Sequence, residues 1–164
     1  MGIKSARNLA GAVNRMLVVV QPEDDTFARL VQQAGWLAVP CAQWRAGMGA
    51  SLACGVRACG TAEGWIVALA DMPFIQTATI VAVVDALRAG VAIAAAVQGG
   101  RRGHPVGFSR HYYAELTALT GDTGARHILE RDSSGITQVA VNDPGIFRDV
   151  DRPGDVQTPR VLQS

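Results

Sequence analysis

One carboxylate, Asp71, follows an uninterrupted apolar run at residues 66–70, and Pro73 comes two residues later. Five apolar residues in a row predict a strand that is buried on both faces, as in a parallel sheet covered by helices, and proline prevents it from continuing. Open α/β sheets bind ligands beyond the carboxyl ends of their strands, so Asp71 is a candidate for site chemistry. The alternative is that Asp71 only forms a turn, with its side chain bonded to the backbone two residues on.

Two glycines, Gly47 and Gly49, precede an expected helix that carries Leu52, Val56 and Cys59 toward the core. Glycines before a helix N-terminus let backbone N–H groups approach an anion or a flat base closely. Such a pattern is also common in ordinary loops, and that interpretation stays open.

Residues 98–108 are rich in glycine and include Arg101, Arg102 and His104. Their pattern fits neither the helical nor the strand period, so we expect an irregular loop, with a brief strand over residues 106–108. A flexible basic loop suits an acidic ligand, although a solvated surface loop has the same composition.

These candidates lie among alternating apolar runs and segments with helical periodicity. Alternation of this kind is typical of βαβ units, and it predicts a single α/β/α Rossmann-like domain with a mostly parallel sheet. The strands of that sheet are expected at residues 16–20, 36–39, 66–70 and 91–97.

The bulk properties suit a compact domain without a nucleic-acid or membrane partner. The chain has 164 residues, a hydrophobic fraction of 49% and a formal net charge of +1, with scattered basic residues and no apolar run of membrane-spanning length. No signal peptide is expected, which favours a cytoplasmic location. Cys41, Cys54 and Cys59 are expected as free thiols packed like small hydrophobic residues.

Five stretches together resemble the molybdenum cofactor cytidylyltransferase family, within the wider group of MobA-like nucleotidyltransferases. They are Gly-Met-Gly-Ala-Ser-Leu at 47–52, Leu-Ala-Asp-Met-Pro at 69–73, Arg-Gly-His-Pro-Val at 102–106, Gly-Asp-x-Gly-Ala-Arg at 121–126 and Asp-Val-Asp-Arg-Pro-Gly-Asp at 149–155. Each motif is moderately specific, and their common order extends over nearly the whole chain. The resemblance implies a fold of the nucleotide-diphospho-sugar transferase type.

The resemblance also implies the roles of individual residues. Asp71 and Asp151 would be catalytic and would share a Mg²⁺ or Mn²⁺ ion, which offsets the charge that builds up when an α-phosphate is attacked. The residues that would contact the nucleotide base are Gly47, Gly49 and Ser51, and those that would line the acceptor side are Gly103, His104, Pro105 and Arg126.

One part of the family pattern has no counterpart in this sequence. The family opens with a strand and a glycine-rich loop that cradles the triphosphate, followed by a lysine. Here Met1 is followed within four residues by a segment that resembles the family's first helix. We therefore expect residues 1–164 to form one nucleotidyltransferase-like domain that is N-terminally truncated relative to the family. Lys4 and Arg7 are not assigned the roles of the missing loop.

The implied activity is transfer of a nucleoside monophosphate, CMP in preference to GMP, from a nucleoside triphosphate to molybdopterin. The resemblance favours CTP; composition does not distinguish it from GTP. Two alternatives stay open: a non-catalytic accessory protein that holds a pterin or a partner such as a molybdoenzyme, and a sugar-nucleotide transferase. An open sheet edge would also allow a homodimer.

Overall fold

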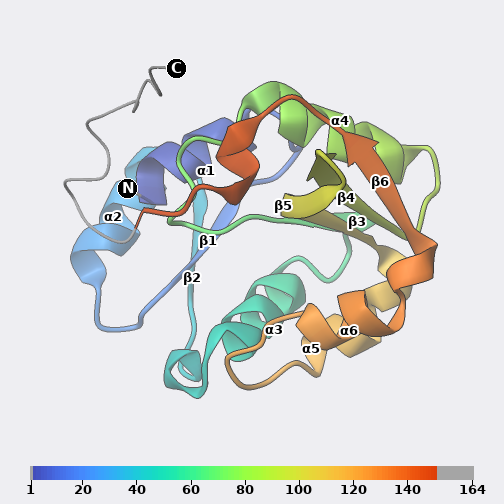
Figure 1. The fold of residues 1–164 in the computed structure, drawn as a ribbon. Helices are drawn as coiled ribbons and strands as arrows, with labels where there is room; N and C mark the ends of the chain where they lie inside the picture. Colours follow the sequence, from blue (N-terminus) through green and yellow to red (C-terminus); the bar gives the residue numbers. More distant parts are fainter. Residues whose placement is uncertain (1, 151–164) are drawn as a thin grey trace.

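A computed structural model of the chain describes residues 2–150. The helices are α1 (Gly2–Ala10), α2 (Asp25–Gln33), α3 (Met48–Ala58), α4 (Thr77–Arg88), α5 (Tyr113–Thr117) and α6 (Arg126–Arg131), with short 3-10 turns η1 (Trp44–Ala46), η2 (Arg110–Tyr112), η3 (Ser133–Gly135) and η4 (Pro144–Phe147). Helices cover both faces of the strands, with α4 on one side and α3, α5 and α6 on the other (Figure 1). The expected α/β class is confirmed. None of the helices within residues 2–150 is long and apolar enough to cross a membrane.

The described strands form two sheets. They are β1 (Leu17–Val20), β2 (Leu37–Pro40), β3 (Gly64–Val67), β4 (Ile93–Gln98), β5 (Arg101–Ser109) and β6 (Ile136–Ala140). Strands β1 and β2 pair in parallel, whereas the second sheet has the order β3-β5-β4-β6. Strand β5 runs antiparallel to both β3 and β4, and β6 runs parallel to β4. The four predicted strands are all present, but the prediction that they form one parallel sheet is wrong.

Strand β5 explains this difference. Residues 98–108 were expected to be an irregular loop, but Gly99 and Gly100, with φ of 59° and 75°, form a two-residue turn between β4 and β5. Positive φ at both central residues suits the tight turn of a β-hairpin and favours glycine. The hairpin places β5 between β3 and β4, so these two strands are not neighbours.

Strand β3 ends earlier than the apolar run predicts. It was expected at residues 66–70, and its last paired residue is Val67, opposite Val106 on β5. The next residue of β5 toward its start is Pro105, which has no N–H group to continue the ladder. Residues 68–70 therefore leave the sheet before Asp71 is reached.

The apolar residues of β4 alternate between two core clusters, which confirms burial on both faces. Ile93 and Ala95 pack in a cluster with residues of α3 and α5, such as Val56. Ala94 and Ala96 face the opposite side, where Val83 of α4 packs against them. Strand β4 is thus rigidly held between the two helical layers.

Two of the three cysteines form a disulfide, contrary to the expectation of free thiols. Cys41 follows β2 and Cys54 lies on α3, and the Cα atoms of the pair are 6.0 Å apart. The pair lacks any recognisable spacing in the sequence, and packing of the end of β2 beside α3 brings it together. Cys59 is free and buried, as expected.

Candidate active site

Asp71 lies in the turn that follows β3. Two hydrogen bonds to backbone carbonyls of this turn, from different segments of the chain, hold it in place. The hydroxyl of Ser5 on α1 donates a hydrogen bond to the carbonyl of Ala70 at 2.8 Å. The amide of Val150 donates to the carbonyl of Asp71 itself, also at 2.8 Å. Asp71 is exposed. The fold therefore fixes the Asp71 backbone at the carboxyl end of β3 while its side chain faces solvent.

Asn8 on α1 secures the rest of this turn. Its side-chain amide donates to the carbonyls of Pro73 at 3.2 Å and Ile75 at 3.0 Å. One helix thus satisfies three carbonyls of an irregular segment, which would otherwise have to find partners in water. Such bonding limits the motion of the Asp71 turn.

His104 on β5 lies at the same edge of the sheet as Asp71. Because β5 runs opposite to β3, the early residues of β5 lie where β3 ends. The pKa of His104 is lowered chiefly because the ring is largely buried; Asp71 and a hydrogen bond with the Val67 backbone act to raise it, and Arg102 acts to lower it. Within residues 2–150, Nδ1 of His104 is buried and has no hydrogen-bond partner. A neutral ring at physiological pH can offer this atom to a ligand.

Gly103 and Pro105 lie on either side of His104, and both are tightly packed. A Cβ atom at Gly103 would lie 2.4 Å from the carbonyl oxygen of Ile146, so only glycine lets η4 pack this closely. Pro105 is fully buried. Both residues shape the backbone beside His104, whether or not they also touch a ligand.

Gly47 and Gly49 pack against the connection between α5 and α6. A Cβ atom at Gly47 would lie 2.2 Å from Oδ1 of Asp122, and one at Gly49 would lie 2.6 Å from the carbonyl oxygen of Thr120. The amide of Gly49 donates to the carbonyl of Gly121 at 2.7 Å. This N–H group is already bonded within the protein and is not available to a ligand. The two glycines therefore allow close packing of the α5–α6 connection against the start of α3.

Ser51 and Arg126 belong to the two segments that meet at this contact, α3 and the start of α6. Ser51 is half-buried in the first turn of α3, and Arg126 is exposed at the start of α6. The α5–α6 connection reaches the start of α3, where Gly124 lies against Met48. The predicted site residues thus fall into two groups, one around Asp71 and His104 and the other around Gly47 and Arg126.

Of the two carboxylates predicted to share a metal ion, only Asp71 is among the described residues. Asp151 lies outside the described residues, and no cluster of three or more His, Cys, Asp or Glu side chains suitable for a metal occurs within residues 2–150. The exposed carboxylate of Asp71 fits a hard cation, because Mg²⁺ is usually held by one or two carboxylates together with substrate phosphates. The shared site of Asp71 and Asp151 stays a prediction.

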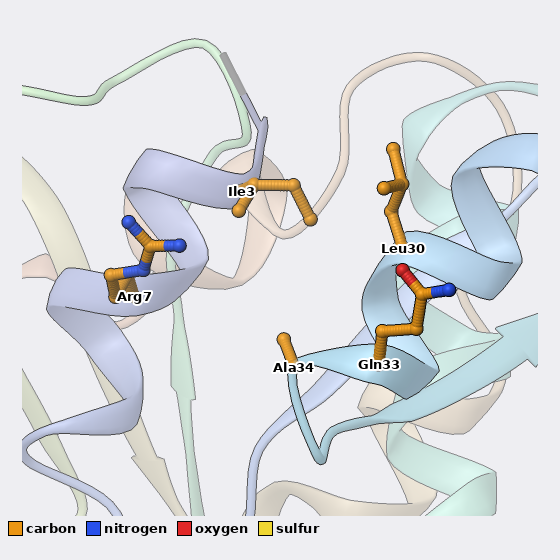
Figure 2. Close-up of a pocket in the computed structure, with 5 residues that line it drawn as sticks. All are labelled: Ile3, Arg7, Leu30, Gln33 and Ala34. Atoms are coloured by element: carbon orange, nitrogen blue, oxygen red, sulfur yellow. The ribbon is translucent and has the colours of Figure 1, made fainter.

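A surface groove lies between α1 and α2. Figure 2 shows Ile3 and Arg7 on one side of it, facing Leu30, Gln33 and Ala34 on the other. None of the predicted site residues lines it. We therefore place the candidate active site at Asp71 and not in this groove.

The structure adds two basic residues that the sequence did not indicate. Nζ of Lys4 lies 5.0 Å from the centroid of the Phe74 ring, and Cζ of Arg148 lies 4.0 Å from the same centroid. Phe74 is three residues from Asp71. No local motif links three residues so far apart in the chain, so only the fold reveals this cluster.

Several solved structures share this fold at low sequence identity, and three of them are described here. Rv0371c from Mycobacterium tuberculosis H37Rv is 24% identical with a TM-score of 0.75, and the match covers 95% of this chain and 81% of that one. A nucleotidyl transferase from Methanothermobacter thermautotroptrophicus, Mth528, is 17% identical with a TM-score of 0.73 over 94% of this chain and 74% of that one. A CMP:2-keto-3-deoxy-manno-octonic acid synthetase solved with CTP is 13% identical, with a TM-score of 0.70, and the match covers 94% of this chain and 83% of that one.

Comparison with curated proteins found no match. A family model does match, and it covers residues 1–136, which include the Asp71 turn, His104 and both glycines of the second group. The match spans well over half of the 164 residues. The chain therefore belongs to the family of MobA-like NTP transferase domains.

Proposed function

We propose that this protein transfers CMP from CTP to the phosphate of molybdopterin. The observation that carries the proposal is the placement of Asp71 and His104 at one edge of the sheet, in a chain that belongs to the MobA-like NTP transferases. In the reaction, a phosphate oxygen of the acceptor attacks the α-phosphorus of CTP. A new P–O bond forms, and pyrophosphate leaves with the electron pair of the broken bond.

Asp71 and Asp151 are the residues that would hold a divalent cation. When bound, Mg²⁺ or Mn²⁺ would neutralise charge on the reacting phosphate oxygens. A neighbour supports this assignment, because the M. tuberculosis protein Rv0371c has been solved in complex with manganese. The bonds from Ser5 and Val150 keep the backbone of Asp71 in place, so little reorganisation is needed when the nucleotide arrives.

The other predicted residues divide between base and acceptor. We assign Ser51, with the backbone at Gly47 and Gly49, to the cytosine base. The structural neighbour solved with CTP supports a cytidine nucleotide.

We assign Gly103, His104 and Pro105 to the acceptor, with the buried Nδ1 of His104 available for a hydrogen bond. Arg126 would bind an acidic group of the acceptor from α6.

The test is an assay of pyrophosphate release with CTP or GTP, Mg²⁺ and molybdopterin. Release should require molybdopterin and be faster with CTP. Asp71→Asn should reduce the rate by about a hundredfold or more, as expected when a preorganised charge at the transferring phosphate is lost. Asp85→Asn is the matched control, because Asp85 is an exposed carboxylate on α4 that pairs with Arg88.

Three results would contradict the proposal. Release without molybdopterin but with a sugar acid would favour a sugar-nucleotide transferase. Binding of molybdopterin without any release would favour an accessory protein. Equal rates for Asp71→Asn and the unmodified protein would remove Asp71 from the reaction.

A further inference from the structure

We propose that the Cys41–Cys54 disulfide is a redox switch, which orders the segment that it encloses and so sets the affinity of that segment for the nucleotide. The enclosed segment, residues 42–53, includes Gly47, Gly49 and Ser51. This inference rests on the proposed function, which assigns these three residues to the cytosine base, and it adds the regulation of that site. The reductant is a dithiol, and the oxidant is the corresponding disulfide.

The disulfide joins the two ends of the enclosed segment. Cys41 directly follows β2, and Cys54 lies in the second turn of α3. The Cα atoms of the pair are 6.0 Å apart, across 13 positions of the sequence. The 3-10 turn η1 and the first turn of α3 lie between them, so the covalent closure limits the conformations open to both.

Backbone bonding within the enclosed segment is mostly local. The amides of Trp44, Ala46 and Gly47 each donate to the carbonyl three residues earlier. The amide of Gly49 reaches out of the segment, to the carbonyl of Gly121 at 2.7 Å. Most of residues 42–48 are exposed. Local bonds keep the shape of a turn but do not fix it relative to the rest of the fold, so the disulfide supplies much of that order.

The two sulfur atoms differ in their access to a reductant. Cys41 is 0% exposed, whereas Cys54 is half-buried. A thiolate of the dithiol therefore attacks Sγ of Cys54, the S–S bond breaks, and Cys41 leaves as a thiolate that takes up a proton. The second thiol then closes the disulfide of the reductant, and Cys54 leaves and is protonated. Two electrons and two protons pass to the protein.

The reduced state also has partners for both sulfur atoms. Sγ of Cys41 lies 3.8 Å from the carbonyl oxygen of Ala50, and Sγ of Cys54 lies 3.9 Å from Oε1 of Gln43. Each thiol can donate a weak hydrogen bond to the oxygen beside it. Reduction therefore loosens the enclosed segment without unfolding the domain, and the change is reversible.

The nucleotide responds to this difference in order. In the oxidised state the segment is ordered before the base arrives, whereas in the reduced state binding must also order it, which weakens the affinity. A purely structural disulfide predicts different behaviour: reduction would lower the stability and leave the affinity unchanged. Affinity and local order must therefore be measured on the same samples.

The experiment measures CTP affinity by calorimetry, with Mg²⁺ present, before and after treatment of the folded protein with dithiothreitol. Alkylation counts the free thiols, which should rise from one, Cys59, to three. The reduced protein should bind CTP about three- to tenfold more weakly, the effect of ordering one or two further side chains. Reoxidation with oxidised dithiothreitol should restore the affinity.

Two variants and one further measurement complete the test. Cys54→Ser should bind CTP like the reduced protein and should not respond to dithiothreitol. Cys59→Ser is the matched control and should keep the whole response, because Cys59 is buried and outside the disulfide. Hydrogen exchange without CTP should be faster across residues 42–53 in the reduced protein, which reports their order independently of any activity.

The outcomes separate this inference from the proposed function. If pyrophosphate is released from CTP but both redox states bind CTP equally, the switch is wrong and the activity stands. The switch is also wrong if dithiothreitol reduces only the unfolded protein. If exchange and CTP affinity both respond but no transfer to molybdopterin occurs, the switch stands and the activity is wrong. Binding of CTP in neither state overturns both. Should Cys54→Ser fail to fold, the two states of the unmodified protein decide.

Discussion

The amide of Val150 donates a hydrogen bond to the carbonyl of Asp71 at 2.8 Å, across 79 positions of the sequence. This bond joins the segment that follows η4 to the turn that ends β3. Together with the contact from Ser5 at 2.8 Å, it makes the position of Asp71 a property of the whole fold. The activity proposed here depends on this placement, and the following predictions test it and the structure around it.

A divalent cation should stabilise the protein through Asp71. A ligand that binds only the folded state raises its stability by mass action, so millimolar Mg²⁺ or Mn²⁺ should raise the melting temperature. Asp71→Asn should abolish most of this increase, because it removes a charged ligand. Asp85→Asn should retain the whole increase. A melting temperature that does not respond to either metal, with or without CTP, would contradict a cation site at Asp71.

Asp143 should be essential for stability although it lies outside the candidate site. It is 1% exposed, and its carboxylate accepts hydrogen bonds from the amide of Gln76 at 2.8 Å, the hydroxyl of Thr79 at 2.7 Å and the amide of Gly145 at 2.9 Å. Asp143→Ala leaves these donors without a partner, which should reduce the free energy of unfolding by about 3 kcal/mol in urea denaturation.

A smaller change at the same place provides the comparison. Thr79→Val removes one of the three donors and keeps the shape of the side chain, so its cost should be about 1 kcal/mol. Equal losses for Thr79→Val and Asp143→Ala would show that the other two bonds contribute little.

His104 should make the fold less stable in mild acid. Burial lowers its pKa in the folded state below the ordinary value of 6.5, so the unfolded chain binds the proton more readily. The corresponding contribution to stability is fully present above pH 6.5. It declines as the pH falls through 6.5 toward the lower folded-state pKa. Unfolding free energies of the protein and of His104→Gln, measured from pH 7.5 to 5, should diverge in this interval. Parallel curves would show that the ring titrates as in water.

The Cys41–Cys54 disulfide should stabilise the segment that carries Gly47 and Ser51. It closes a loop of 13 positions, and cross-links of this length contribute about 3 kcal/mol in the chain-entropy description. Reduction with a dithiol should lower the melting temperature by several degrees. A Cys41→Ser/Cys54→Ser double variant should melt at the reduced value and show no response to the dithiol. An unmodified protein that is equally stable in both states would contradict the prediction.

Local patterns in the sequence were sufficient for most of the elements. The four apolar runs became β1, β2, β3 and β4, as expected for short continuous apolar stretches bounded by turn residues. Helix α4 was recognisable from its 3.6-residue period. Strand β5 was missed because its first residues are exposed arginines, and the signal that indicates it is the Gly99–Gly100 turn.

The sequence by itself determined the α/β class and singled out Asp71, since a carboxylate after a buried strand must lie at an edge of the sheet. Only the tertiary structure decided which residues surround it. The placement of His104 depends on an antiparallel pairing, and that of Lys4 and Arg148 on contacts between segments about 70 positions or more from Phe74. The same holds for the contact of Gly47 with Asp122, which lies 75 positions away. Contacts of such separation leave no periodic trace in the chain, because they arise only when the packed layers bring distant segments together.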